Sequence, residues 1–176
     1  TVDPHLHRTA DLSASWTTPV TVLSAAPVLA AALPDPATPL VVGPDEEAGA
    51  WAAALADALG APHVTFHKER RGDRDVRLAL PEGLAIRGRS AVLVDDVCST
   101  GVTLERATER LRAAGAVSVD IAVTHALFDD EGLARLKRAG ARWIVSSDSC
   151  RHPTNAAPLA DLLAAALRGE LAPDGP

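Results

Sequence analysis

The residues best suited to chemistry form one string in the middle of the chain, residues 95–103. Two carboxylates, Asp95 and Asp96, precede a group of small hydroxyl residues that leads into a predicted helix. Backbone N–H groups of a tight, small-residue turn at a helix N-terminus bind anions, and hydroxyl side chains add donors without bulk. Gly101 permits the backbone conformation of such a turn. The string therefore predicts a site for a small phosphate, whose candidate binding residues are Asp95, Asp96, Cys98, Ser99, Thr100, Gly101, Val102 and Thr103.

The two carboxylates restrict which ligands the site can bind. Because they would repel a bare phosphate, they fit best if they accept hydrogen bonds from sugar hydroxyls or face a metal ion. A solvated acidic pair at a strand end, followed by a capped helix, is the structural alternative and the better reading of an Asp-Asp pair alone. The whole string favours a binding site. Neither a Walker A pattern nor the dinucleotide-binding glycine fingerprint occurs in the sequence, so those nucleotide sites lack their signature.

Alternating strands and helices are expected to position this string. Apolar runs and turn residues predict strands over residues 39–43, 63–66, 75–80, 90–95, 117–124 and 142–145, and helices over residues 46–59, 102–114, 130–139 and 157–167. Residues 67–74 are expected as a polar, basic segment. This alternation is typical of an α/β protein in three layers, with a mostly parallel sheet flanked by helices and ligands at the carboxyl ends of the strands. We expect one domain over residues 1–170 and a frayed tail over residues 171–176.

The composition excludes several functions. With 17 Lys and Arg against 23 Asp and Glu, the formal net charge is -6, and aromatic residues make up only 3%. Such a chain is a poor general binder of nucleic acid and lacks the aromatic residues of a stacking surface for single strands. No apolar run is long enough to span a bilayer, so no membrane partner is expected. Cys98 and Cys150 form neither a disulfide framework nor a zinc spacing, which favours a cytoplasmic protein.

A resemblance to a known family starts from the same string. Residues 92–96, followed by residues 99–103, resemble the phosphoribosyl pyrophosphate (PRPP) motif of the type I phosphoribosyltransferases. That superfamily includes the ribose-phosphate diphosphokinases, also called PRPP synthetases. The resemblance implies a type I phosphoribosyltransferase-like fold. It also implies that Asp95 and Asp96 bind the 2- and 3-hydroxyls of a ribose, and that residues 99–103 bind its 5-phosphate.

Further segments resemble the carboxyl-terminal half of a ribose-phosphate diphosphokinase. They are the Asp-x-His segment at residues 3–7, the Pro-containing residues 19–20 and 26–29, the Pro-Asp loop at residues 43–45, the basic residues 68–76, the Thr-His segment at residues 124–128, and the polar residues 147–149 with 152–153. The resemblance makes Lys68 and Arg70 the candidate catalytic residues, on a flexible loop whose cations neutralise a transferring phosphoryl group. It makes His5, His7 and Asp45 the candidate metal ligands.

The residues themselves leave alternatives open in these segments. His5 and His7 face one side of an extended segment, either as surface histidines or as metal ligands. Asp45 precedes a predicted helix, where a carboxylate is favourable without any ligand. A basic run such as that at Lys68 is usually a solvated loop, and His125 is more simply a hydrogen-bonded histidine at a strand end.

The expected activity is that of a ribose-phosphate diphosphokinase, which transfers pyrophosphate from Mg-ATP to ribose 5-phosphate and yields PRPP and AMP. The expected cofactor is Mg²⁺. The expected partners are ATP, ribose 5-phosphate or PRPP, and further copies of the chain in a homo-oligomer. Family members carry a similar amino-terminal half that supplies contacts to adenine, and this half is expected to be absent from the chain. The alternatives are a phosphoribosyltransferase that consumes PRPP and a non-catalytic module that senses PRPP or nucleotides.

Overall fold

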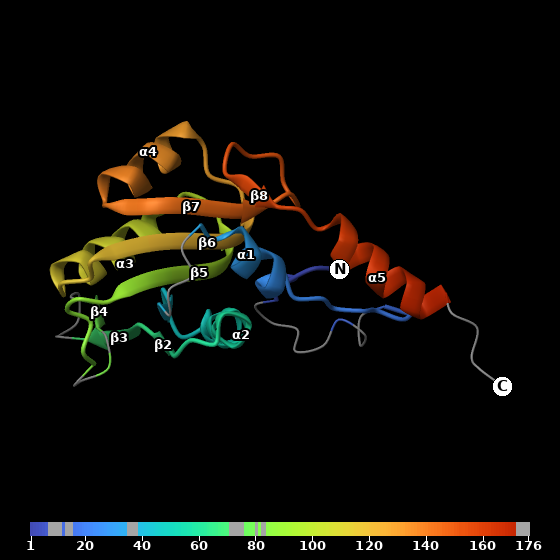
Figure 1. The fold of residues 1–176 in the computed structure, drawn as a ribbon, viewed down its shortest axis with the longest axis horizontal. Helices are drawn as coiled ribbons and strands as arrows, with labels where there is room; N and C mark the ends of the chain where they lie inside the picture. Colours follow the sequence, from blue (N-terminus) through green and yellow to red (C-terminus); the bar gives the residue numbers. More distant parts are fainter. Residues whose placement is uncertain are drawn as a thin grey trace.

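Six strands form one sheet at the centre of the computed structural model, and helices lie on both of its faces (Figure 1). The structure describes residues 1–6, 12, 16–34, 39–70, 76–79, 81 and 84–171, and for residues 68–70, 76–78, 170 and 171 it describes the backbone alone. The sheet order is β2-β1-β5-β6-β7-β8, and every neighbouring pair is parallel. Its strands are β1 (Leu40–Gly43), β2 (His63–Thr65), β5 (Ser90–Cys98), β6 (Ser118–Ala126), β7 (Ala141–Ser147) and β8 (Asn155–Ala157). The helices are α1 (Ala26–Ala32), α2 (Gly49–Leu59), α3 (Val102–Ala113), α4 (Asp130–Arg138) and α5 (Ala160–Leu171).

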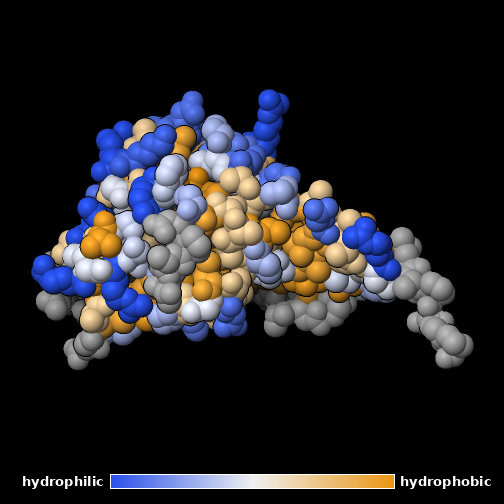
Figure 2. Space-filling view, viewed as in Figure 1, coloured by the Kyte–Doolittle hydropathy of each residue, from blue (hydrophilic) through white to orange (hydrophobic). Residues whose placement is uncertain are grey.

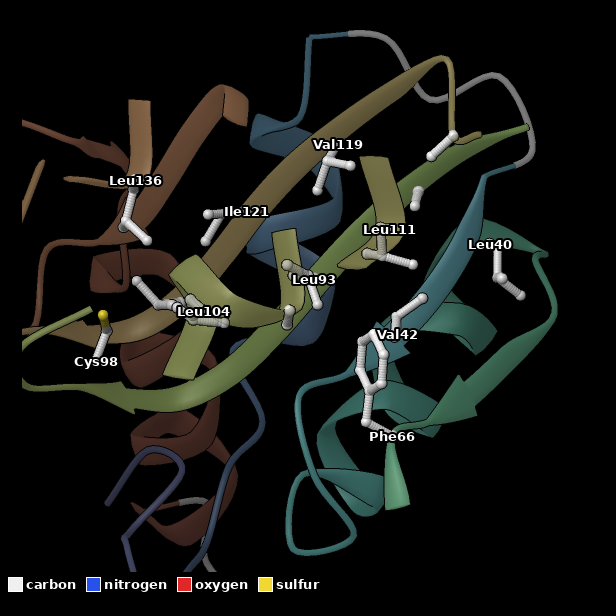
Figure 3. Close-up of a cluster of buried hydrophobic side chains, with 14 of the residues drawn as sticks. Leu40, Val42, Phe66, Leu93, Cys98, Leu104, Leu111, Val119, Ile121 and Leu136 are labelled. Carbon is white, nitrogen blue, oxygen red and sulfur yellow. The ribbon is translucent and has the colours of Figure 1, made fainter. Parts of the chain in front are cut away.

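Two apolar clusters, one on each face of the sheet, hold the layers together. Leu93 of β5 belongs to the same cluster as Leu104 and Leu111 of α3 (Figure 3). Its neighbours Val92 and Val94 pack on the other face with residues of α1 and α2. Because consecutive residues of a strand point to opposite faces, one uninterrupted apolar strand supplies both clusters. The predicted three-layer α/β fold is confirmed.

Several element boundaries differ from the sequence pattern, and the larger differences are in β5, α2 and α5. β5 continues to Cys98, so the acidic pair predicted at the end of the strand lies within it. α2 begins at Gly49 rather than at residue 46, because residues 44–48 first form bends and a turn. α5 begins at Ala160 rather than at residue 157, because Ala157 ends the short strand β8, which the sequence did not predict.

The basic segment expected as an irregular loop is in part a strand. Residues 67–70 form β3 (His67–Arg70), which pairs antiparallel with β4 (Val76–Ala79) in a separate two-stranded sheet. The predicted strand over residues 75–80 is thereby confirmed as β4. A charged sequence can form such a strand because the ladder uses only backbone N–H and C=O groups.

Helix α5 extends away from the sheet (Figure 1), and apolar side chains gather along it on the face seen in Figure 2. Leu163 and Leu167 of α5, together with Trp16 and Leu23 of the first segment, contribute to the lining of an apolar groove of about 600 Å³. No described helix, α5 included, combines the length and the apolar character that crossing a membrane requires. Of the predicted tail, residues 172–176 lie outside the described residues, and Leu171 still belongs to α5.

Candidate functional site

The carboxyl end of β5 carries the predicted acidic pair. Asp95 and Asp96 are consecutive, so their side chains leave opposite faces of the strand. Asp95 is in register with Val123 of β6, on the face that α3 covers, whereas Asp96 points to the face covered by α1 and α2. Both side chains nevertheless line one cleft at the end of the strand, although Asp96 is almost fully buried there. A ligand in this cleft would meet both carboxylates.

Asp96 is held in a fixed orientation. The residue is 1% exposed, and both of its carboxylate oxygens have partners. Oδ2 lies 2.6 Å from Nδ1 of His5, and Oδ1 accepts a hydrogen bond of 2.8 Å from the N–H of Val97. A buried carboxylate requires such partners, yet each oxygen keeps a second lone pair that can accept from a ligand hydroxyl.

Residues 99–103, the turn after β5 and the first two residues of α3, are the predicted phosphate site and are called the phosphate loop below. Gly101 has a φ of 79°, in the left-handed region that favours glycine, and its carbonyl accepts a hydrogen bond of 2.8 Å from the N–H of Glu105 in α3. The first turn of a helix has N–H groups without intrahelical partners, and these groups attract anions. Ser99 and Thr100 are exposed, and a hollow of about 40 Å³ is lined by Asp95 and residues 97–104. The loop therefore has the shape and the donors that a small phosphate needs.

Helix α4 supports the phosphate loop from a neighbouring position. A Cβ atom at Gly132, in the first turn of α4, would lie 3.2 Å from the carbonyl oxygen of Thr100 and 2.8 Å from Cβ of Phe128. Only glycine lets the helix approach this closely. The close packing of α4 against Thr100 therefore helps to hold the backbone of the phosphate loop in place.

Cys98 belongs to the packing of the core. Its side chain is buried among apolar residues, as Figure 3 shows. Burial, followed by the nearby charge of Asp95, raises the pKa of the Cys98 thiol to about 12. The carbonyl of Cys98 accepts a hydrogen bond of 2.9 Å from the N–H of Leu127. A contact of Cys98 with a ligand would thus come from its backbone.

Asp45 reaches the same cleft from the loop after β1. Its Oδ1 accepts hydrogen bonds from the N–H groups of Glu47 and Ala48, at 3.0 and 3.2 Å. These bonds stabilise the turn that precedes α2. The helix itself begins at Gly49 after Ala48 and has no side-chain cap, so the interpretation of Asp45 as a cap of this helix is wrong. Its position in the cleft keeps the role at a metal ion or a phosphate as a prediction.

One cleft of about 600 Å³ brings together the acidic pair, Asp45 and two residues of the phosphate loop. It is lined by His5, Leu6, Asp45, Glu47, Trp51, Asp95, Asp96, Val97, Ser99 and Thr103. Burial raises the pKa of Asp95 to about 7, and the negative charges of Asp96 and Asp45 add to the effect. Negative charge is thus concentrated beside the phosphate loop, where a cation or a hydroxyl donor would relieve it.

The carboxylates fit Mg²⁺ as an ion shared with a substrate. Mg²⁺ is usually bound by one or two carboxylates together with substrate phosphates, rather than by a cage made only of protein. Across the part of the chain that the structure describes, no three His, Cys, Asp or Glu side chains form a metal-binding group. Asp45 and Asp95 supply hard oxygen ligands in the cleft, whereas Nδ1 of His5 contacts Asp96. The third predicted metal ligand, His7, lies outside the described residues.

Lys68 and Arg70 lie on β3, and the described structure includes their backbone but not their side chains. β3 follows directly after β2, whose last residue Thr65 is in register with Gly43 at the end of β1. The N–H of Phe66 also bonds to the carbonyl of Gly43 at 2.9 Å. The basic segment therefore begins at the carboxyl edge of the sheet, near the loop that carries Asp45.

The first segment of the chain forms part of this site, as the resemblance implied for His5, but its side-chain contacts were not predicted from the sequence. His125, interpreted as a hydrogen-bonded histidine at a strand end, has this role: Nδ1 lies 2.8 Å from Oγ of Ser149, and Nε2 lies 3.1 Å from the carbonyl oxygen of Asp3. The contact of His5 with Asp96 was not predicted either. The only signal for it was the Asp-x-His spacing at residues 3–5.

Comparison with known proteins identifies the family of the chain. Residues 35–167 match the family described as phosphoribosyl transferase domain. A ribose-phosphate pyrophosphokinase of Methanothermobacter thermautotrophicus is 29% identical over 163 residues, which are 93% of this chain and 56% of the relative. The enzyme of the same name from Pyrococcus furiosus is 36% identical over 100 residues, 57% of this chain and 36% of the relative. The chain thus spans between about a third and just over half of these curated relatives.

Solved structures agree with the sequence relatives. The phosphoribosylpyrophosphate synthetase of Mycobacterium smegmatis superposes with a TM-score of 0.71 at 28% identity, over 92% of this chain and 55% of that protein. An adenine phosphoribosyltransferase of Giardia lamblia, solved with 9-deazaadenine, has a TM-score of 0.59 at 21% identity, over 69% of this chain and 75% of that protein. The similarity to the adenine phosphoribosyltransferase shows a shared fold.

Proposed function

The chain belongs to the phosphoribosyl transferase domain family, and on that premise we propose that it carries the ribose 5-phosphate site of a ribose-phosphate pyrophosphokinase. The observation that carries the proposal is the cleft in which the phosphate loop meets Asp45, Asp95 and Asp96. The names of the sequence relatives support the same activity. In this reaction a pyrophosphoryl group moves from ATP to ribose 5-phosphate, giving PRPP and AMP.

The phosphate loop would bind the 5-phosphate of the sugar. N–H groups at the start of α3 and the hydroxyls of Ser99, Thr100 and Thr103 supply donors, and the hollow of about 40 Å³ limits the ligand to a small anion. Asp95 and Asp96 would accept hydrogen bonds from the 2- and 3-hydroxyls. The raised pKa of Asp95, about 7, favours this role, because a hydroxyl donor relieves the charge that its surroundings disfavour.

The chemical step is an in-line substitution at the β-phosphorus of ATP. The 1-hydroxyl oxygen of ribose 5-phosphate forms a bond to this phosphorus, and its proton is released. The bond from the β-phosphorus to the oxygen that bridges it to the α-phosphorus breaks, and AMP leaves with the electron pair. Little covalent chemistry falls to the protein, so its contribution is positioning and stabilisation of charge.

Asp45 and Asp95 would hold a Mg²⁺ ion together with substrate phosphates. The bound ion supplies positive charge to the pyrophosphoryl group. Lys68 and Arg70, on the segment that begins near Asp45, would add cations over the same group. These cations stabilise the charge that develops on the transferring phosphate.

Binding and turnover test the proposal separately. Isothermal titration with ribose 5-phosphate should give a saturable signal, and Thr100→Glu should abolish it, because a carboxylate in the phosphate loop repels the ligand. Thr17→Glu places the same charge on an exposed threonine that does not line the cleft, so it should bind as wild type does. Retained binding in Thr100→Glu would refute the assignment of the phosphate loop.

Turnover distinguishes this activity from the alternatives. AMP formation from ATP and ribose 5-phosphate supports the proposed reaction. Release of pyrophosphate from PRPP with a nucleobase would instead identify a phosphoribosyltransferase. Binding of ribose 5-phosphate or PRPP with neither product would identify a sensing module.

A further inference from the structure

Asp3 is a strained and buried residue next to the cleft. Its φ of 36° lies in the left-handed region, where the residue is the only non-glycine among those described. Such a conformation is costly and persists only where surrounding contacts impose it. The side chain is 7% exposed, and its Oδ2 accepts two hydrogen bonds: 3.0 Å from the N–H of Ala25 and 2.8 Å from Oγ1 of Thr124.

His125 holds the same residue by its backbone. Nε2 of His125 lies 3.1 Å from the carbonyl oxygen of Asp3, and because a carbonyl only accepts, Nε2 is assigned the proton. The other ring nitrogen, Nδ1, lies 2.8 Å from Oγ of Ser149, whose hydroxyl donates to the carbonyl of Thr124 at 2.9 Å. The carboxyl end of β6 therefore binds Asp3 twice, through Thr124 at the side chain and through His125 at the backbone.

This attachment determines where His5 lies. His5 is two residues after Asp3, so it cannot move far from a fixed Asp3. Its Nδ1 lies 2.6 Å from Oδ2 of Asp96, the oxygen not held by the N–H of Val97. The path of contacts runs from β6, through Asp3, to the carboxylate in the cleft.

We propose that Asp3, Thr124 and His125 are positioning residues, which hold His5 against Asp96 and thereby orient that carboxylate for the ribose hydroxyls. The inference rests on the proposed function. None of the three residues lines the cleft, so each acts through His5 rather than by touching the ligand. Loosening any of them would weaken the hold on His5 and, through it, on Oδ2 of Asp96.

Three variants test the contacts by titration with ribose 5-phosphate at constant Mg²⁺. Thr124→Val removes the hydroxyl that binds Asp3 and should weaken binding about tenfold, the effect expected for one lost hydrogen bond. Asp3→Asn keeps an acceptor oxygen and tolerates the positive φ, so its affinity should stay within about threefold of wild type. Thr108→Val is the matched control: Thr108 is equally buried, and its hydroxyl bonds to the carbonyl of Leu104 within α3 at 2.7 Å. It should bind as wild type does.

A double-mutant cycle separates positioning from general destabilisation. If Thr124 acts through His5, then Thr124→Val should cause no further loss of affinity in a His5→Ala background. Full additivity of the two losses would overturn the proposal, and so would a Thr124→Val affinity equal to that of Thr108→Val. Should Thr124→Val fail to fold, Asp3→Gly takes its place in the cycle, since glycine keeps the positive φ and removes the carboxylate. Absence of binding in wild type refutes the proposed function and this inference with it, whereas failure in the variants alone refutes only the positioning role.

Discussion

Asp95→Asn should make the protein more stable at alkaline pH while impairing ligand binding. Burial and the charges of Asp96 and Asp45 raise the pKa of Asp95 from 3.8 to about 7, so its ionised form is unfavourable in the folded protein. Asparagine keeps the size of the side chain and removes the charge. The same change takes away a charged acceptor for a ribose hydroxyl, which should weaken binding of ribose 5-phosphate by about 1–3 kcal/mol.

The sign and the size of the effect follow from proton linkage. Between pH 3.8 and about 7, folded Asp95 holds a proton that the unfolded chain has released, so the unfolding free energy of wild type falls as pH rises. From pH 5 to the folded pKa, at about 1.4 kcal/mol per pH unit, the loss has a ceiling of about 3 kcal/mol. Water at the mouth of the cleft screens part of the repulsion, so we expect about 2 kcal/mol.

Urea unfolding of wild type and Asp95→Asn at pH 5 and pH 8 measures this loss. The stability of the variant relative to wild type should rise by about 2 kcal/mol between the two pH values. Taking the difference at each pH cancels the titration of groups that do not interact with Asp95. Asp57→Asn, which removes a charge from an exposed position on α2, is the control and should show no such change. A difference between Asp95→Asn and wild type that is the same at both pH values would contradict the reasoning.

Four further substitutions test the phosphate loop and the basic segment. Gly101→Ala should cost about 1–2 kcal/mol of stability, because the φ of this residue is positive, and should lower the affinity for ribose 5-phosphate measured by titration. Gly60→Ala, also at positive φ, is the control and should cost similar stability while leaving that affinity unchanged. Gly132→Ala should weaken the same titration, because its methyl group would push against the backbone of the phosphate loop, and a wild-type affinity would exclude that support. Lys68→Ala and Arg70→Ala should each lower steady-state AMP formation by about 10²–10³ with little change in sugar-phosphate affinity, and near-normal turnover would remove them from catalysis.

The sheet and the phosphate loop were predictable because local pattern determines both. The apolar run from residue 90 can only be a buried strand in this context, and Gly101 after small hydroxyl residues predicts the start of α3. The edge of the sheet at which a ligand was expected could be predicted from the parallel arrangement alone, since ligands of such sheets lie at the carboxyl ends of the strands. Asp45, Asp95 and Asp96 are accordingly found in one cleft.

The parts that could not be predicted depend on contacts between distant residues. Strand β8 has only three residues, too few for a periodic pattern, and it is a strand because it pairs with β7. β3 is polar and pairs through its backbone. The bond between His5 and Asp96 joins residues separated by 91 positions, and the positive φ of Asp3 follows from its burial beside Thr124. No window of sequence contains both members of these pairs.

The position of the first segment also affects how the chain can mature on the ribosome. Asp3 is separated from Thr124, its hydrogen-bond partner on β6, by 121 positions. At a translation rate of about 5–20 residues per second, Asp3 is synthesised roughly 6–24 s before that partner exists. During this time the first segment can make its contacts with Leu23 and Ala25 but not those with β6, whereas α2 already has β1 beside it. The nascent protein therefore acquires its sheet strand by strand, and the wall of the cleft that contains His5 can close only after β6 has emerged.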